Sequence, residues 1–215
     1  MFGPIQSHGQ PVTLVGAGDG SVELLKMALA RAPTLLAVDG GAALAMEAGA
    51  EMAAVVGDFD SIGDLNLPKD LLLHTPDQNL TDFQKSLAAT DAPGILAVGF
   101  LGGRLDHQLA AFTALLQDRR PIVLMSETEL AFLAPAELSL DLPEGSAISF
   151  YPLTDARFDS SGVAYPLSDA AMAPAGLIST SNMVAGGPVR LRATGGVLVT
   201  LPLAGLDAVL AALWQ

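Results

Sequence analysis

The sequence contains no cysteine among its 215 residues, and this absence excludes several kinds of chemistry at once. Disulfide bonds, thiolate nucleophiles, zinc–thiolate sites and iron–sulfur clusters all require cysteine. Charged residues make up only 15% of the chain, below the roughly 25% that is usual in globular domains, while 51% of the residues are hydrophobic. The chain therefore folds by burying apolar side chains, and intrinsic disorder is excluded.

Positive charge is also scarce. The sequence has ten Lys and Arg residues but 23 Asp and Glu residues, so its net charge is −13. Such a balance argues against the basic surface that binds nucleic acid, so we expect no nucleic-acid partner. No apolar run reaches the roughly 18 to 20 residues of a membrane helix, and the first ten residues lack a signal-peptide pattern. We expect a cytoplasmic protein without a membrane anchor. An acidic chain can still bind phosphate groups through Mg²⁺ held by carboxylates.

The first two-thirds of the chain repeats one pattern four times: a short apolar run, a loop rich in Gly and Asp, and a stretch with helical periodicity. The loops are residues 16–20, 39–41, 57–61 and 102–104. Apolar runs without alternation predict strands covered on both faces, and their alternation with helices predicts a parallel sheet. Ligands bind at the carboxyl ends of such strands, so the four loops predict a single site.

The pattern changes after about residue 135, where Pro and Gly become frequent and short runs alternate between apolar and polar residues. Alternation of this kind predicts antiparallel strands. We therefore predict an α/β fold with two domains. A mostly parallel, Rossmann-like sheet flanked by helices occupies residues 1–136, with the runs 121–125 and 130–133 completing it, and an antiparallel β-sandwich occupies residues 137–215.

Two acidic groups are candidates for metal binding. Asp58 and Asp60 stand two residues apart where a strand ends, so both side chains point to the same side, and such a pair suits Mg²⁺. Thr81 begins a helix with a capping box, which places Asp82 in the first turn and Lys85 on the same face. The alternatives are a solvated turn for the first pair, and helix capping with a weak ion pair for the second.

The segment from Gly102 to His107 joins a strand to a helix and suits phosphate binding. The start of the helix offers free N–H groups, and Arg104 can bind phosphate through two hydrogen bonds. Asp106 would orient Arg104 or bind metal. His107 is a further candidate ligand contact, although a lone helical histidine is more often structural.

The loop at residues 16–20 does not fit a dinucleotide fingerprint. The third glycine of that motif would fall at position 21, which is Ser21, and Asp19 inside the loop would repel a pyrophosphate. A P-loop motif is also missing from the sequence. These mismatches disfavour an NAD-dependent oxidoreductase.

Taken in order along the chain, the motifs resemble the thiamine pyrophosphokinase family. The matching blocks are Asp39-Gly40-Gly41-Ala42, residues 57–62, Pro76-Asp77-Gln78 with Thr81-Asp82-Phe83-x-Lys85, residues 102–107, residues 162–167 and Ser179-Thr180-Ser181-Asn182. Each block is weak by itself, but six blocks in one order cover nearly the whole chain. The chain departs from the family pattern at Ala43, where Asn is frequent, and at Asn79, where an acid is frequent.

The resemblance implies an α/β catalytic domain that binds ATP, a β-sandwich domain that binds thiamine, and a homodimer with the site near its interface. It implies transfer of diphosphate from ATP to the hydroxyl of thiamine, with release of AMP. The residues that it assigns to Mg²⁺ and the phosphates are Asp58, Asp60 and Asp82. It further assigns Gln78, Lys85, Arg104 and Asp106 to the diphosphate site, Asp39, Gly40, Gly41, Thr81 and His107 to the nucleotide, and Ser181 and Asn182 to thiamine.

Two other functions remain compatible with these residues. A pyrophosphokinase for another hydroxymethyl heterocycle, such as a pterin, would use the same phosphate site with a different β-domain pocket. A non-catalytic sensor of thiamine or nucleotide would have the same scaffold, but the retained acidic residues and Arg104 favour an enzyme. Attack on the phosphate chain of ATP requires cations around a polyanion, so we expect positioning and electrostatic stabilisation to dominate the mechanism.

Overall fold

The computed structural model describes residues 9–59, 65–75, 77 and 79–214. Two compact units make up the chain, residues 1–127 and residues 128–215. Strands and helices alternate along most of the first unit. Its described elements are β1 (Val12–Val15), α1 (Val22–Leu29), β2 (Thr34–Val38), η1 (Asp39–Gly41), α2 (Ala42–Glu47), β3 (Ala54–Gly57), η2 (Lys69–Leu71), β4 (Leu72–His74), α3 (Asp82–Ala88), β5 (Ile95–Val98), α4 (Leu105–Gln117) and β6 (Ile122–Met125).

The strands of the first unit form a parallel sheet in the order β6-β5-β1-β2-β3-β4, which confirms the predicted fold class. The chain builds the sheet outward from β1 to β4 on one side and then from β5 to β6 on the other. The direction therefore reverses between β1 and β5. In open α/β sheets the ligand crevice lies at the carboxyl ends of the strands, at this point of reversal.

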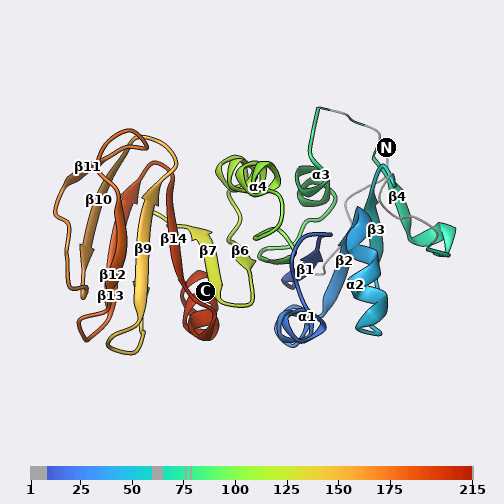
Figure 1. The fold of residues 1–215 in the computed structure, drawn as a ribbon, viewed down its shortest axis with the longest axis horizontal. Coiled ribbons are helices and arrows are strands. Elements are labelled where there is room, and N and C mark those ends of the chain that lie inside the picture. Colours follow the sequence, from blue (N-terminus) through green and yellow to red (C-terminus); the bar gives the residue numbers. More distant parts are fainter. Residues whose placement is uncertain (1–8, 60–64, 76, 78, 215) are drawn as a thin grey trace. The chain divides into compact units, whose positions relative to one another are not determined.

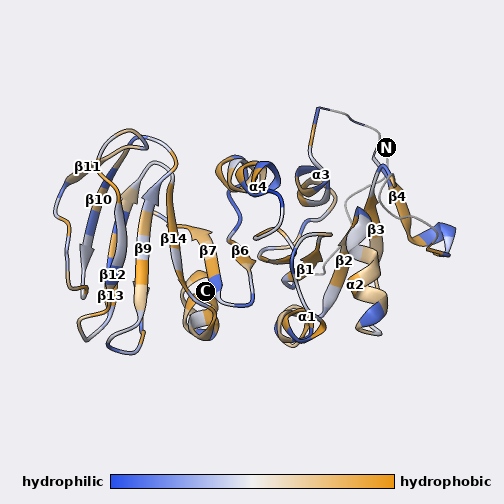
Figure 2. Ribbon diagram, in the orientation of Figure 1, coloured by the Kyte–Doolittle hydropathy of each residue, from blue (hydrophilic) through white to orange (hydrophobic). Residues whose placement is uncertain are grey.

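Helices cover both faces of this sheet (Figure 1): α1 and α2 lie on one face, and α3 and α4 lie on the other. The central strands are apolar along their length (Figure 2), and every residue of β1, β3, β5 and β6 is buried. The predicted capping box is confirmed, because Thr81 and Gln84 each bond to the other's backbone N–H at the start of α3. This cap fixes where Asp82 enters the helix.

The second unit consists mainly of antiparallel strands. Its elements are β7 (Glu129–Leu133), β8 (Glu137–Leu140), β9 (Ala147–Pro152), β10 (Ala156–Ser161), β11 (Ala170–Met172), β12 (Ser179–Met183), β13 (Val189–Thr194), β14 (Val197–Pro202), η3 (Leu203–Gly205) and α5 (Leu206–Leu213). One set of neighbours is β12-β9-β14-β7 and the other is β11-β10-β13-β8. The rings of Phe150 and Phe158, both fully buried, pack with centroids 4.9 Å apart between the two sheets.

The run at residues 130–133 forms strand β7, which follows β6 in the strand order, as the sequence predicted. It pairs antiparallel with β14 and belongs to the second unit, which begins at residue 128. The domain boundary between residues 136 and 137 stays a prediction. Among the described residues, none of the helices combines the length and apolar character needed to cross a bilayer.

Arg120, which precedes β6, forms hydrogen bonds to backbone groups at the end of α3. We expect Arg120→Met to lower the free energy of unfolding by about 2 kcal/mol. Its guanidinium donates to the carbonyl oxygens of Leu87 at 2.6 Å and Thr90 at 2.7 Å, and it pairs with Asp118 at 2.5 Å. Removing it leaves carbonyl groups and a partly buried carboxylate without their donor. Urea unfolding at pH 7 would measure the loss.

Arg119→Met is the matched control, since Arg119 is exposed and makes no described side-chain contact. Burial by itself raises the pKa of Asp118, but the hydrogen bonds from Arg120 outweigh it and hold that pKa below 3.8. The pair therefore stabilises the fold above pH 3.8, and the contribution disappears as pH falls through the lowered pKa. Equal destabilisation by both variants would contradict this account. So would an effect of Arg120→Met that does not become smaller as pH falls through the lowered pKa of Asp118, although the part that comes from the two carbonyl groups should remain.

Candidate functional site

The loops after β1 and β5 meet at the point where the strand order reverses. The backbone N–H of Gly16 donates to the carbonyl of Val98 at 2.8 Å, and that of Gly18 donates to the carbonyl of Gly99 at 3.1 Å. Beside them, a Cβ atom on Gly41 would lie 2.0 Å from the carbonyl oxygen of Val15. Only glycine fits there, so the Asp39-Gly40-Gly41 turn can pass directly over the end of β1.

A cleft of about 490 Å³ opens at these loops. It is lined by the loop after β1, the end of β2, the start of α3, the loop after β5 and the start of α4. The predicted single site at the strand ends thus has a physical counterpart in the first unit. Six of the predicted site residues line the cleft: Asp39, Gly40, Thr81, Asp82, Arg104 and His107.

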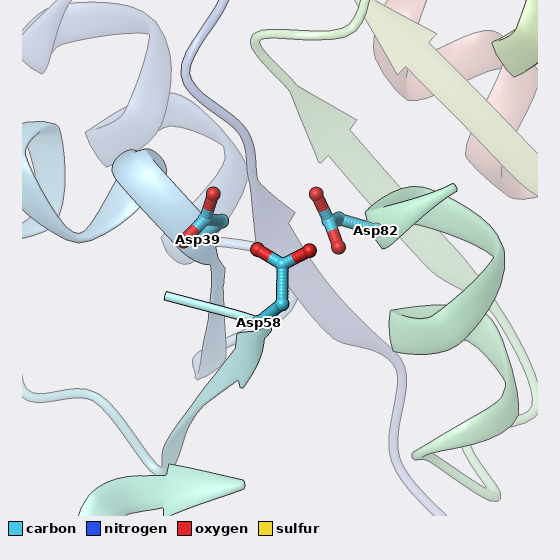
Figure 3. A group of neighbouring side chains, drawn as sticks. All are labelled: Asp39, Asp58 and Asp82. Carbon is cyan, nitrogen blue, oxygen red and sulfur yellow. The ribbon is translucent and has the colours of Figure 1, made fainter. Parts of the chain in front are cut away.

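Three carboxylates converge beside this cleft (Figure 3). Asp39 follows β2, Asp58 follows β3 and Asp82 begins α3, and one carboxylate oxygen from each lies within 4.8 Å of the others. Figure 3 shows the three side chains gathered in one place, with Asp58 between Asp39 and Asp82. Oxygen atoms from carboxylates in this arrangement are the ligands that Mg²⁺ prefers.

Asp39 is the member of this group that the sequence did not place with the metal ligands. Its side chain is buried, and its backbone has φ +47°, in the left-handed region that residues other than glycine rarely adopt. A Cβ atom on Gly57 would lie 3.0 Å from the Asp39 Cβ, so the glycine that ends β3 makes room for Asp39. The backbone therefore holds Asp39 in a costly conformation that directs its carboxylate toward Asp58 and Asp82.

Lys85 lies against the acidic group and is 5% exposed. Its ammonium group is 2.9 Å from Asp82 Oδ1 and 3.8 Å from Asp58 Oδ2. Burial by itself lowers the pKa of Lys85, but the hydrogen bond to Asp82 and the charges of Asp82, Asp58 and Asp77 outweigh burial and raise it above 10.5. Lys85 is thus charged at neutral pH, and the three carboxylates keep a net excess of negative charge.

Arg104 and Asp106 form an ion pair at the start of α4, with 2.6 Å between Nη2 and Oδ2. Both side chains are mostly exposed, at 70% and 64%, so the pair costs little to open when another anion binds Arg104. The hydrogen bond from Arg104 lowers the pKa of Asp106, and the same bond raises the pKa of Arg104. Asp106 also accepts a hydrogen bond from the backbone N–H of His107 at 3.0 Å.

Ser181 and Asn182 lie on β12 in the second unit. Ser181 is exposed with φ +57°, at an irregularity in the pairing of β12 with β9. Asn182 is buried, and its side chain bonds to both the N–H and the carbonyl of Tyr165. The structure therefore gives Asn182 a role in holding the Tyr165 loop, beside the exposed Ser181. Two further predicted residues, Asp60 and Gln78, lie outside the described residues.

Sequence reasoning missed several residues of the cleft. Asp19, Phe83 and Phe100 line it, and the rings of Phe83 and Phe100 pack with centroids 4.2 Å apart. Asp19 was interpreted as an argument against a dinucleotide fingerprint in this loop. The aromatic residues belong to the apolar patterns of α3 and of the β5 run, and those patterns alone do not separate a core residue from a cleft residue.

The sequence matches two family models. Residues 25–124 match the catalytic domain of thiamin pyrophosphokinase, and residues 136–198 match the vitamin B1 binding domain of thiamin pyrophosphokinase. Thiamin pyrophosphokinase 1 of Caenorhabditis elegans is 26% identical over 168 residues, which is 69% of each chain. Thiamine pyrophosphokinase 1 of Oryza sativa subsp. japonica is 28% identical over 172 residues, covering 69% of this chain and 65% of the rice protein.

Solved structures share the fold at lower identity. The thiamine pyrophosphokinase of Bacillus subtilis has a TM-score of 0.75 and 20% identity, with 90% of this chain and 98% of the other covered. The thiamin pyrophosphokinase of Candida albicans has a TM-score of 0.75 and 15% identity, with 94% and 93% covered. These similarities extend over both units of the chain.

Proposed function

Because the chain belongs to the thiamin pyrophosphokinase family, we propose that its cleft transfers diphosphate from ATP to the hydroxyl of thiamine, giving thiamine diphosphate and AMP. The observation that carries the proposal is the convergence of Asp39, Asp58 and Asp82 beside a cleft at the carboxyl ends of β1, β2 and β5. The thiamine hydroxyl oxygen would bond to the β-phosphorus of ATP, the bond from that phosphorus to the α,β-bridging oxygen would break, and the hydroxyl proton would leave to solvent or a nearby base.

Mg²⁺ fits the acidic group. Three carboxylates and one lysine leave an excess of two negative charges, which a divalent cation balances. We propose Asp39, Asp58 and Asp82 as its ligands, with Asp60 as a predicted fourth acid from the same loop. The cation would neutralise charge on the phosphate oxygens as they approach the carboxylates.

The remaining residues of the first unit would position the phosphate chain. Arg104 would leave Asp106 and bind phosphate oxygens, while Asp106 holds the first turn of α4 through the N–H of His107. Thr81 would orient Asp82 through the capping box. Gln78 and Lys85 complete the predicted diphosphate site, and the buried position of Lys85 suits it to neutralising the carboxylates.

We place thiamine recognition in the predicted β-sandwich domain, residues 137–215, with Ser181 as a direct contact and Asn182 acting through the Tyr165 loop. The homodimer is proposed on family resemblance, as is a cytoplasmic location where ATP is supplied. Light scattering would test the dimer, because one chain has a mass of 22.0 kDa and a dimer has twice that.

The decisive experiment incubates the protein with ATP, Mg²⁺ and thiamine and separates the products. We expect AMP and thiamine diphosphate in equal amounts. Formation of ADP instead would show simple phosphoryl transfer and overturn the proposal. AMP formed with a hydroxymethyl pterin but not with thiamine would identify the pterin enzyme, and binding without turnover would identify a sensor.

A further inference from the structure

Asp19 has a definite partner in the structure. Its Oδ2 atom accepts a hydrogen bond from the backbone N–H of Gly103 at 2.9 Å, across 84 positions of sequence. Asp19 belongs to the loop after β1 and Gly103 to the loop after β5, which are the two loops that flank the reversal of strand order. The carboxylate therefore links the two sides of the crevice.

The turn that Asp19 contacts has an unusual backbone. Gly102 and Gly103 both have positive φ, at +80° and +66°, and a Cβ atom on Gly102 would lie 2.5 Å from Asp19 Oδ2. Two glycines thus let the chain wrap closely around the carboxylate, and backbone N–H groups in such a turn attract an anion. Asp19 is exposed and lines the cleft, and its Oδ2 atom is bonded to the turn.

Arg104 follows this turn directly and is the N-cap residue of α4. Its side chain is 70% exposed, so packing contributes little to its orientation. Its guanidinium bonds to Asp106, and its backbone continues directly from Gly103, the residue that bonds to Asp19. The first N–H groups of α4 depend on the same turn.

We propose that Asp19 is a positioning residue for ATP. Its carboxylate holds the Gly102-Gly103 turn so that Arg104 and the start of α4 face the phosphates in the cleft. The identity of the ligand as ATP rests on the proposed function. Asp19 itself is not required to contact ATP. To hold the turn, its side chain needs an oxygen atom that accepts the hydrogen bond from Gly103, but it does not need a negative charge.

Asp19→Ala and Asp19→Asn separate these requirements, because Asn keeps an oxygen acceptor at the same place. We expect Asp19→Ala to raise the KM and the calorimetric Kd for ATP by about five- to tenfold, the effect of one lost hydrogen bond to the turn. The KM for thiamine should change by less than about twofold, and Asp19→Asn should restore most of the ATP affinity. Hydrogen exchange at Gly103 should quicken in Asp19→Ala alone.

Glu51→Ala is the matched control. Glu51 is an exposed acid that precedes β3, so it lies where the parallel strands begin, whereas the cleft lies where they end. Unchanged ATP affinity in Asp19→Ala would overturn the inference. The inference would also be overturned if Asp19→Asn weakened ATP binding as much as Asp19→Ala does. A lower melting temperature of Asp19→Ala together with weaker thiamine binding would overturn it as well, because both would indicate a general structural defect. Calorimetry with ATP and hydrogen exchange need no turnover, so a wild-type protein that forms no thiamine diphosphate would overturn the proposed function while these readouts still decide the role of Asp19.

Discussion

Asp58→Asn is expected to lower kcat/KM for thiamine diphosphate formation by about 10²- to 10³-fold, the largest effect on activity that we anticipate. Asn keeps the shape of the side chain but removes one of the three negative charges that converge beside the cleft. The free energy of unfolding should change by less than about 1 kcal/mol, because Asp58 is at the weaker of the two Lys85 contacts. Steady-state kinetics at several Mg²⁺ concentrations would measure the loss, and added Mg²⁺ should recover part of it.

A second readout separates cation binding from chemistry. Mn²⁺ can replace Mg²⁺ at carboxylate sites and is detected directly by electron paramagnetic resonance. Asp58→Asn should weaken Mn²⁺ binding to the protein, whereas Asp141→Asn, which removes an exposed carboxylate of the second unit, should not. Normal Mn²⁺ affinity in Asp58→Asn would show that Asp58 is not a ligand, even if the activity falls.

The sequence predicted two of the three carboxylates of the acidic site as metal ligands. The patterns made Asp58, at a strand end, and Asp82, at a helix start, candidates for metal binding, and the family resemblance assigned both to Mg²⁺. The structure brings their carboxylates together. Asp39 was predicted as a nucleotide contact, although β2 and β3 are neighbours and their ends must lie side by side. That adjacency depends on strand order, which one sequence does not contain.

The parallel sheet was predictable because the sequence repeats one pattern four times: an apolar run, a loop rich in Gly and Asp, and a stretch with helical periodicity. The element β4 was not predicted, since it has only three residues and none of them is buried. The only helix in the described part of its connection from β3 is the short 3-10 helix η2. The strand β7 was predicted from its run of buried apolar residues, but its pairing partner was not. Its antiparallel partner β14 is about 70 residues away, so local pattern gives no indication of the pairing.

Lys85→Met is expected to destabilise the protein by about 2 to 3 kcal/mol and to reduce activity as well. The substitution leaves the carboxylates of Asp58 and Asp82 beside a buried apolar group without their cation. Removing one partner of a fully buried ion pair lowers the free energy of unfolding by more than this. The loss is smaller here because Asp82 is 35% exposed and water would solvate part of its charge. Urea unfolding without metal measures the loss, and Lys26→Met, at an exposed position of α1, is the control.

Cation and pH dependence distinguish this role of Lys85 from simple phosphate binding. With three carboxylates uncompensated, Lys85→Met should gain more stability from added Mg²⁺ than the wild type gains, because the cation replaces the missing charge. The folded state raises the pKa of Lys85 above 10.5, so its contribution is complete below pH 10.5 and is lost as pH rises through the raised value. The difference in stability between the two proteins should therefore stay constant from pH 7 to 9 and shrink only in stronger alkali. A variant that lost activity but kept full stability at pH 7 would instead assign Lys85 to the phosphates, and the carboxylates would then need no internal counter-ion.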